Sequence, residues 1–166
     1  MQTRIPTMNR NSAIRAARTA VTGAQNAGRQ DSYVAAEKMG IDMEREWVAT
    51  LDNRTRHAHA MLDGRIVPID KPFKVDGYEL MYPGDPEGKV YLIYNCCCTA
   101  IAKVKGVDVS DAMRRDRYGV LPGMTYAQWE NTKRGEGAIA TEQYTKKVAE
   151  RETKDRKQYA EYKTVL

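Results

Sequence analysis

Apolar side chains are concentrated between about residues 41 and 104, and the segments before and after this stretch are far more polar. Its most apolar part is Val90–Val104. A folded domain needs one contiguous core, and a chain of 166 residues usually forms only one. The sequence therefore predicts a single modest globular domain in the middle of the chain, with polar arms at both ends.

Positive charge is carried mainly by these two ends. Residues 1–40 hold six basic and two acidic side chains, residues 41–140 hold 14 and 15, and residues 141–166 hold seven and five. Basic arms can contact DNA phosphates or an acidic protein surface, and charge alone does not choose between these partners. We expect at most weak, sequence-independent DNA contact through the arms, which could also mediate self-association.

Two classes of protein are excluded by composition. No apolar run approaches the roughly 20 residues of a membrane span, and no signal peptide opens the chain, so no contact with a membrane is expected. The three cysteines, Cys96, Cys97 and Cys98, are consecutive and cannot link distant parts of a fold. The chain is therefore not a disulfide scaffold.

The N-terminal arm has the spacing of a helix over residues 11–39, ending at Gly40. Gly28 marks an expected weak point or bend. We expect the buried seam of this helix to be the small apolar side chains at three- and four-residue spacing, which are Ile14, Ala17, Val21 and Ala24.

The central segment predicts an α+β fold. Residues 41–51 alternate polar and apolar and then become apolar, as in a strand, and Asp52 or Asn53 is placed to cap a helix through Leu62. The turn Asp63-Gly64 precedes a further strand. The glycines and prolines of residues 70–88 indicate an ordered loop without long elements. We expect a small, mostly antiparallel sheet from residues 41–51, 65–69 and 96–104, packed on a short helix at residues 53–62.

Beyond Gly106 the pattern weakens. Ser110 is placed to cap a single helical turn through Arg117, and Thr125 opens a capping box that predicts a short helix around Trp129. Residues 141–162 have the composition of a charged helix. The domains expected are an N-terminal helical arm at 1–40, an α+β core at 41–106, a linker with short helices at 107–139 and a charged C-terminal helix at 140–166.

Three pieces of sequence follow one another in a specific order. They are Ala16-Ala17-Arg18-Thr19 with Asn26-Ala27-Gly28-Arg29, Trp47 to Asp52 running into Arg54-Thr55-Arg56, His59 and Leu62-Asp63-Gly64, and Tyr82-Pro83-Gly84-Asp85-Pro86 with Tyr94-Asn95-Cys96-Cys97-Cys98-Thr99. Together they resemble the Mu F-like family of phage minor head, or head-morphogenesis, proteins. The match runs from about residue 14 to 104. The positions that it marks are Trp47, Asp52, Arg54, Thr55, Arg56, His59, Asp63, Gly64, Pro83, Gly84, Asp85, Asn95, Cys96 and Cys98.

This resemblance implies a structural protein of a tailed phage or prophage, present in few copies per head. It would associate with the portal or other head proteins and act in head morphogenesis, genome packaging or DNA delivery. The expected location is the host cytoplasm during assembly and then the virion head. Two features depart from the family: Cys97 stands where the family usually has arginine, and the usual longer N-terminal helical region is missing.

His59, Cys96 and Cys98 are the candidate metal ligands. Residues two apart on a strand share a face, so both thiols could point at His59. Structural zinc usually has four ligands, and three are at hand. We therefore favour a protein without a cofactor, in which buried thiols pack beside a hydrogen-bonded histidine, with zinc as the alternative.

A second hypothesis is a nucleic-acid-processing enzyme or toxin-like domain centred on His59 as general base. Its supporting residues would be Asp52, Arg54, Arg56 and Asp63. The favoured interpretation is that Asp52 caps a helix and the others fix a loop. Asn95 is expected to adopt an unusual backbone conformation and to organise the Pro83–Pro86 loop. Trp47 and Trp129 are expected to be core anchors.

Overall fold

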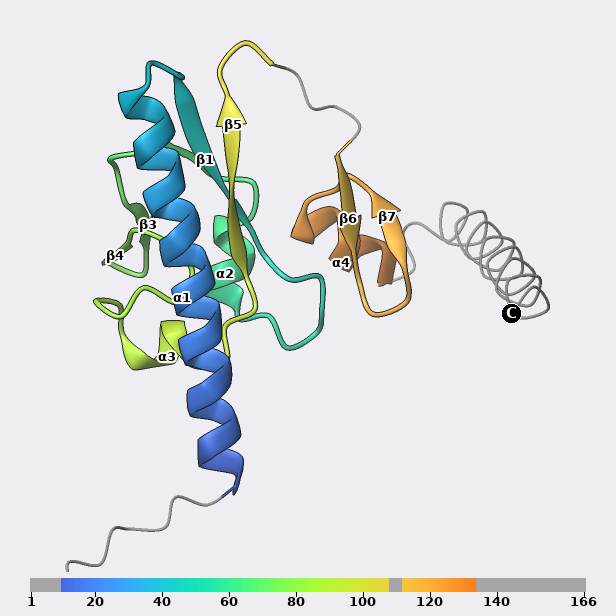
Figure 1. Cartoon of the computed structure of the whole chain (residues 1–166). Coiled ribbons are helices and arrows are strands. Elements are labelled where there is room, and N and C mark those ends of the chain that lie inside the picture. The colour runs from blue at the N-terminus through green and yellow to red at the C-terminus, as the bar shows by residue number, and fades with distance from the viewer. Residues whose placement is uncertain (1–9, 108–111, 134–166) are drawn as a thin grey trace, which may run out of the picture. The chain divides into compact units, whose positions relative to one another are not determined.

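The computed structural model describes residues 10–107 and 112–133, and the chain divides into two compact units, Met1–Asp108 and Val109–Leu166. Each unit is described by itself. The predicted helix over residues 141–162 lies outside the described residues. The first unit contains α1 (Arg10–Lys38), β1 (Met43–Val48), α2 (His57–Leu62), β2 (Ile66–Pro68), β3 (Phe73–Val75), β4 (Tyr78–Leu80), α3 (Val90–Ile93) and β5 (Thr99–Val104) (Figure 1).

The central sheet has the strand order β2-β1-β5, and both pairings are antiparallel. Met43, Arg45 and Trp47 of β1 are buried and alternate with half-buried residues, as the sequence pattern predicts. Two three-residue strands, β3 and β4, form a hairpin within the glycine- and proline-rich segment, closed by Asp76 and Gly77, which both have positive φ. The predicted α+β class with a small antiparallel sheet is confirmed, but the strand predicted at 96–104 begins only at Thr99.

The core gathers around Trp47, whose side chain is fully buried. Its ring meets the Phe73 ring edge-on at 5.2 Å and the His59 ring at 5.4 Å. The predicted helix at 53–62 is shorter than expected, because α2 begins only at His57. Asp52 does not cap it, since the Asp52 carboxylate instead accepts a hydrogen bond from the Arg54 backbone in the preceding turn.

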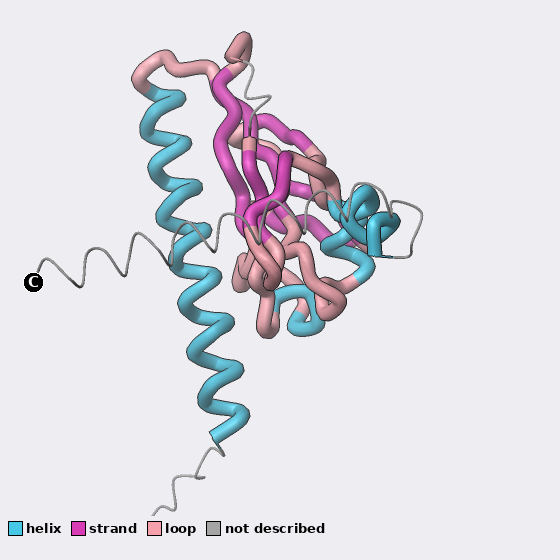
Figure 2. The backbone as a smooth tube through the Cα atoms, turned by 90° about the vertical axis from the view of Figure 1, so that its right-hand side faces the viewer, coloured by secondary structure: helices cyan, strands magenta, loops and turns pink. Residues whose placement is uncertain are grey.

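Helix α1 runs beside the strands in both views, and its N-terminal turns extend past the rest of the unit (Figures 1 and 2). The helix ends before Gly40 as predicted, and it continues through Gly28 without a break in its helical residues. The predicted buried seam is wrong. Ile14, Ala17, Val21 and Ala24 are all exposed, and the buried residues of α1 are Asn26 and Gln30.

The physical reason for this polar seam is that α1 packs against backbone groups. The side-chain amide of Asn26 donates to the carbonyls of Pro83, at 3.0 Å, and Cys98, at 3.1 Å, while its oxygen accepts from the backbone of Ala100. Gln30 donates to the carbonyl of Ile69 at 3.0 Å. A strand edge and a loop present N–H and C=O groups that need partners when buried, and amides supply both donor and acceptor.

A second contact brings the α1 backbone against the Pro83–Pro86 loop. A Cβ atom at Gly23 would lie 2.9 Å from the carbonyl oxygen of Gly84, and Gly84 has a φ of +83°. Backbone atoms on both sides leave no flexible side chain that could move aside. At Gly28, by contrast, a Cβ atom meets nothing within 4 Å.

These two glycines give a matched pair of substitutions. Gly23→Ala is expected to lower the free energy of unfolding by about 1–3 kcal/mol through overpacking. Gly28→Ala is expected to raise it by about 0.5–1 kcal/mol, because alanine is the better helix former. Chemical denaturation of both variants measures the difference. Equal effects at the two positions would contradict the close approach of α1 to the loop.

The second unit contains β6 (Met113–Arg115), β7 (Val120–Pro122) and α4 (Tyr126–Lys133). The predicted helical turn from Ser110 to Arg117 is wrong, because residues 113–115 pair with β7 in an antiparallel hairpin. The capping box is confirmed: the Thr125 backbone donates to the Gln128 side chain at 2.7 Å, and the Gln128 backbone donates back to Thr125 at 3.3 Å.

Trp129 is buried in this second unit, as expected of a core anchor. Its indole N–H donates to the Asp116 carboxylate at 3.2 Å. Within the described part of the chain, none of the helices combines the length and hydropathy needed to cross a membrane.

Candidate functional site

A cavity of about 420 Å³ opens beside the N-terminal half of α1. It is walled by α1, by the segment that joins β1 to α2, by α2 itself and by the segment before β5. The residues that line it are Arg18, Thr50, Asp52, Arg54, Thr55, Arg56, His59, Asn95, Cys96, Cys97 and Cys98. Eight of the positions marked by the family resemblance line this one cavity. They are Asp52, Arg54, Thr55, Arg56, His59, Asn95, Cys96 and Cys98.

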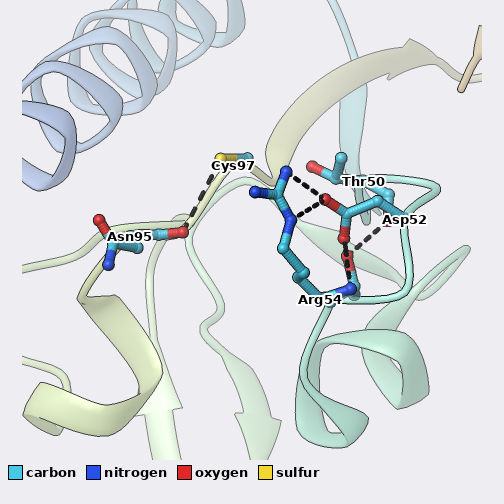
Figure 3. A network of polar contacts seen from close by, with 6 residues as sticks. Thr50, Asp52, Arg54, Asn95 and Cys97 are labelled. Carbon is cyan, nitrogen blue, oxygen red and sulfur yellow. Dashed lines mark hydrogen bonds and ion pairs between the residues drawn. The ribbon is translucent and has the colours of Figure 1, made fainter. Parts of the chain in front are cut away.

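The turn after β1 is organised by Asp52. Its carboxylate accepts the backbone N–H of Arg54 at 2.9 Å, two guanidinium contacts from the same residue at 3.0 and 3.2 Å, and the hydroxyl of Thr55 at 3.1 Å (Figure 3). Thr55 also donates to the carbonyl of Thr50 at 2.6 Å. Burial alone would raise the pKa of Asp52, but the hydrogen bonds from Arg54 and Thr55 outweigh it and lower that pKa. Asp52 therefore remains ionised and holds the turn closed.

Three guanidinium groups face this cavity against one lining carboxylate. Arg54 is paired with Asp52, although its side chain is mostly exposed. Arg56 donates to the backbone carbonyl of Tyr94 and so connects the start of α2 to the segment before β5. Arg18 reaches the cavity from α1. The lining carries a net positive charge, which suits an anionic group.

The segment from Asn95 to Cys98 forms the opposite wall. Asn95 has a φ of +51°, the unusual conformation expected of it, and its backbone N–H donates to the Thr19 hydroxyl of α1 at 3.1 Å. The Cys97 thiol is exposed and lies 3.7 Å from the Asn95 carbonyl oxygen (Figure 3). This wall is therefore fixed to α1 as well as to α2.

The Pro83–Pro86 loop is organised differently from the expectation placed on Asn95. The buried carboxylate of Asp85 accepts the backbone N–H groups of Met81 at 2.7 Å and Glu87 at 3.0 Å, and Asn26 holds the Pro83 carbonyl. Asp85 and Asn26 are thus the residues that shape this loop. The reason is that the side chains of Asp85 and Asn26 lie close enough to hydrogen-bond to backbone groups of this loop.

His59, Cys96 and Cys98 are all buried, and their side chains meet where they line the cavity. The Nδ1 atom of His59 lies 3.4 Å from the Cys98 sulfur and 3.7 Å from the Cys96 sulfur. Hydrogen bonding from Cys98, together with His59, lowers the pKa of Cys96 to about 5. The pairing with Cys96 and burial raise the pKa of Cys98. Cys96 is therefore the more acidic of the two thiols.

The residues considered for catalysis do not all line the cavity. Asp52, Arg54, Arg56 and His59 line the cavity, but Asp63 is not among the lining residues. The Asp63 carboxylate accepts the backbone N–H of Ala49 at 2.7 Å. The next residue, Gly64, has a positive φ and donates its N–H to the Trp47 carbonyl, so this pair shapes the turn before β2.

Sequence reasoning assigned no role to Arg18, Thr50 or Arg45. Arg18 and Thr50 line the cavity. Arg45 lies in the core, and its guanidinium donates to Gln30 Oε1 at 2.6 Å and to the Lys71 carbonyl at 2.5 Å. The signal for Arg45 was present in the sequence, because its position falls on the buried face of a strand that alternates.

The comparisons with known proteins match the sequence of this chain to one family. Residues 1–101 match the family described as Phage Mu protein F like protein, and the chain belongs to it. It is 33% identical over 126 residues to the minor head protein GP7 of Bacillus phage SPP1, covering 71% of this chain and 39% of that protein. It is 36% identical over 104 residues to NAD(+)--arginine ADP-ribosyltransferase EFV of Enterococcus faecalis, covering 63% of this chain and 21% of that protein.

This chain thus spans well under half the length of either relative. No solved structure matches it.

Proposed function

We propose that this chain is the Mu F-like domain of a minor head protein of a tailed phage or prophage. In this role it associates with the portal or other head proteins and acts in head morphogenesis, genome packaging or DNA delivery. The observation that carries the proposal is the 33% identity to a minor head protein over 71% of the chain, within a family match that covers residues 1–101. The site of action is the virion head, after assembly in the host cytoplasm.

The contacts of the marked residues support a scaffold. Asp52, Asp63 and Asp85 each accept hydrogen bonds from backbone N–H groups in turns, and Asn26 holds carbonyls of two separate segments. Carboxylates used in this way fix the geometry of turns and loops. Loops held in this way can present a defined surface to a partner, because binding residues are often on loops positioned by a scaffold.

The exposed stripe of α1 is the surface we assign to the head partner. Ile14, Ala17, Val21 and Ala24 repeat at three- and four-residue spacing, the spacing of a helix–helix seam, and all four face solvent. In the sequence, Arg15 and Arg18 directly follow two residues of this stripe, Ile14 and Ala17. A partner helix with an apolar stripe and acidic flanks fits this surface best. Any contact of this surface with DNA would be weak and independent of sequence.

The enzyme hypothesis is the second candidate, because one relative bears the name of an ADP-ribosyltransferase and the cavity is basic. The aligned part amounts to 21% of that protein. In this chain His59 is buried and its Nδ1 atom already contacts two thiols. We therefore favour a structural role without catalysis for the cavity.

Co-purification with the portal protein of the same genome tests the proposal. We expect the wild-type chain to retain the portal, and the double variant Ile14→Asp, Val21→Asp to lose at least about tenfold in affinity, because two charges would face an apolar partner surface. Met61→Asp, at an exposed site on α2, is the matched control and should bind normally. Portal binding that the double variant leaves unchanged would reject the α1 surface, and absence of binding by the wild type would reject portal association.

A further inference from the structure

Three soft donor atoms converge in the first unit at the distances of a tetrahedral metal site. A zinc ion with bonds of about 2.3 Å to sulfur and about 2.0–2.1 Å to nitrogen holds nitrogen and sulfur ligands about 3.6 Å apart. The His59 Nδ1 atom lies 3.4 Å from Cys98 Sγ and 3.7 Å from Cys96 Sγ. No two of these three atoms are more than 4.8 Å apart.

Hydrogen bonding alone accounts poorly for this arrangement. The Nδ1 atom of an imidazole has either one proton or one in-plane lone pair, so it can make one directed bond, yet two sulfurs approach it. The other ring nitrogen, Nε2, is buried and has no hydrogen-bond partner among the described residues. The polar contacts of the ring are therefore directed entirely at Cys96 and Cys98.

We propose that His59 Nδ1, Cys96 Sγ and Cys98 Sγ form a zinc site. Two thiolates and Zn²⁺ give a centre without net charge, which suits a buried position, and binding releases the thiol protons to solvent. Sulfur and imidazole ligands together favour zinc among the common divalent ions. All three ligand residues line the cavity, so the fourth coordination position faces it and takes a water molecule or a partner side chain.

The local fold is built to hold such an ion. Cys96 and Cys98 flank the exposed Cys97, and both buried thiols lie against the His59 ring. The ion would join α2 to the segment before β5, two elements that Arg56 already connects through the Tyr94 carbonyl. It would thus close the wall of the cavity that lies opposite α1.

The test uses the full chain with Zn²⁺ and, as a spectroscopic probe, Co²⁺. We expect about one zinc ion per chain after purification with added zinc, and thiolate-to-cobalt charge-transfer absorption on titration with Co²⁺. Cys96→Ser, Cys98→Ser and His59→Ala should each lose stoichiometric binding. Cys97→Ser is the matched control, with the same chemistry one residue away on an exposed side chain, and should bind like the wild type.

Two results would overturn the proposal. One is a folded wild-type chain that binds neither ion in competition with a chromophoric chelator of micromolar affinity. The other is loss of binding in Cys97→Ser equal to that in Cys98→Ser. The titration of the wild type needs no variant to fold. A chelator should also lower the melting temperature of the zinc-loaded wild type and leave that of Cys98→Ser unchanged.

Discussion

Replacing Arg45 by alanine is expected to lower the free energy of unfolding by about 3–5 kcal/mol, the largest effect of any single substitution considered. The Arg45 side chain is fully buried in β1. Its guanidinium donates to Gln30 Oε1, to the Lys71 carbonyl and to the Met81 carbonyl. Truncation leaves these buried acceptors without donors, at about 1–3 kcal/mol for each unsatisfied group, and leaves a cavity as well.

Arg45→Lys should recover only part of the loss, because an ammonium group cannot reach acceptors on three segments with the geometry of a planar guanidinium. Arg54→Ala is the control. Its side chain is 87% exposed, so the change should stay within about 0.5 kcal/mol. Urea denaturation of the variants measures these differences. An Arg45→Ala chain as stable as Arg54→Ala would show that the buried guanidinium does not hold α1 and the two loops together.

Asn26→Asp should lower the free energy of unfolding by about 3–4 kcal/mol although it changes one atom of the side chain. The Asn26 nitrogen donates to the carbonyls of Thr22, Pro83 and Cys98. A carboxylate oxygen in its place would face three acceptors and leave a charge poorly compensated in a buried position. Asn26→Ala removes the contacts without adding a charge and should cost less, about 2 kcal/mol.

Gln25→Glu is the matched control, because Gln25 is the exposed neighbour of Asn26 on α1 and the change has the same chemistry. It should alter stability by less than about 0.5 kcal/mol. The pH dependence separates the two positions further: the loss in Asn26→Asp should shrink in acid, where the new carboxyl is protonated and neutral. If Asn26→Asp unfolds no more readily than Gln25→Glu, the polar seam of α1 contributes little to the fold.

The sheet could be predicted because its strands bury one face against a core, and burial of one face produces a period of two in the sequence. Met43 and Trp47 show this period, and β1 lies where it indicates. The packed face of α1 could not be predicted in the same way. Apolar periodicity assumes that a helix packs against side chains, whereas α1 packs against backbone groups through Asn26 and Gln30. The stripe at Ile14 and Val21 remains in the sequence but faces solvent.

In the candidate site, too, local spacing predicted some contacts and not those that depend on how distant segments pack. Strand spacing predicted that Cys96 and Cys98 share a side. Both thiols do lie against His59, but β5 begins only at Thr99, so the two cysteines belong to the segment before the strand. The contribution of Arg18 to the cavity depends on how α1 docks, which local spacing does not encode. The role given to Asn95 in the Pro83–Pro86 loop belongs to Asp85 and Asn26, since an asparagine at positive φ can organise its own turn without contacting a distant one.

The central claim is that this chain is part of a phage head, and quantitative mass spectrometry of purified particles tests it most directly. Particles produced by the genome that encodes the chain would be purified and compared with the unfractionated lysate. The account predicts peptides of this chain in the heads, enriched relative to the lysate and in few copies per head compared with the major capsid protein. Abundant chain in the lysate and none in the purified heads would contradict it.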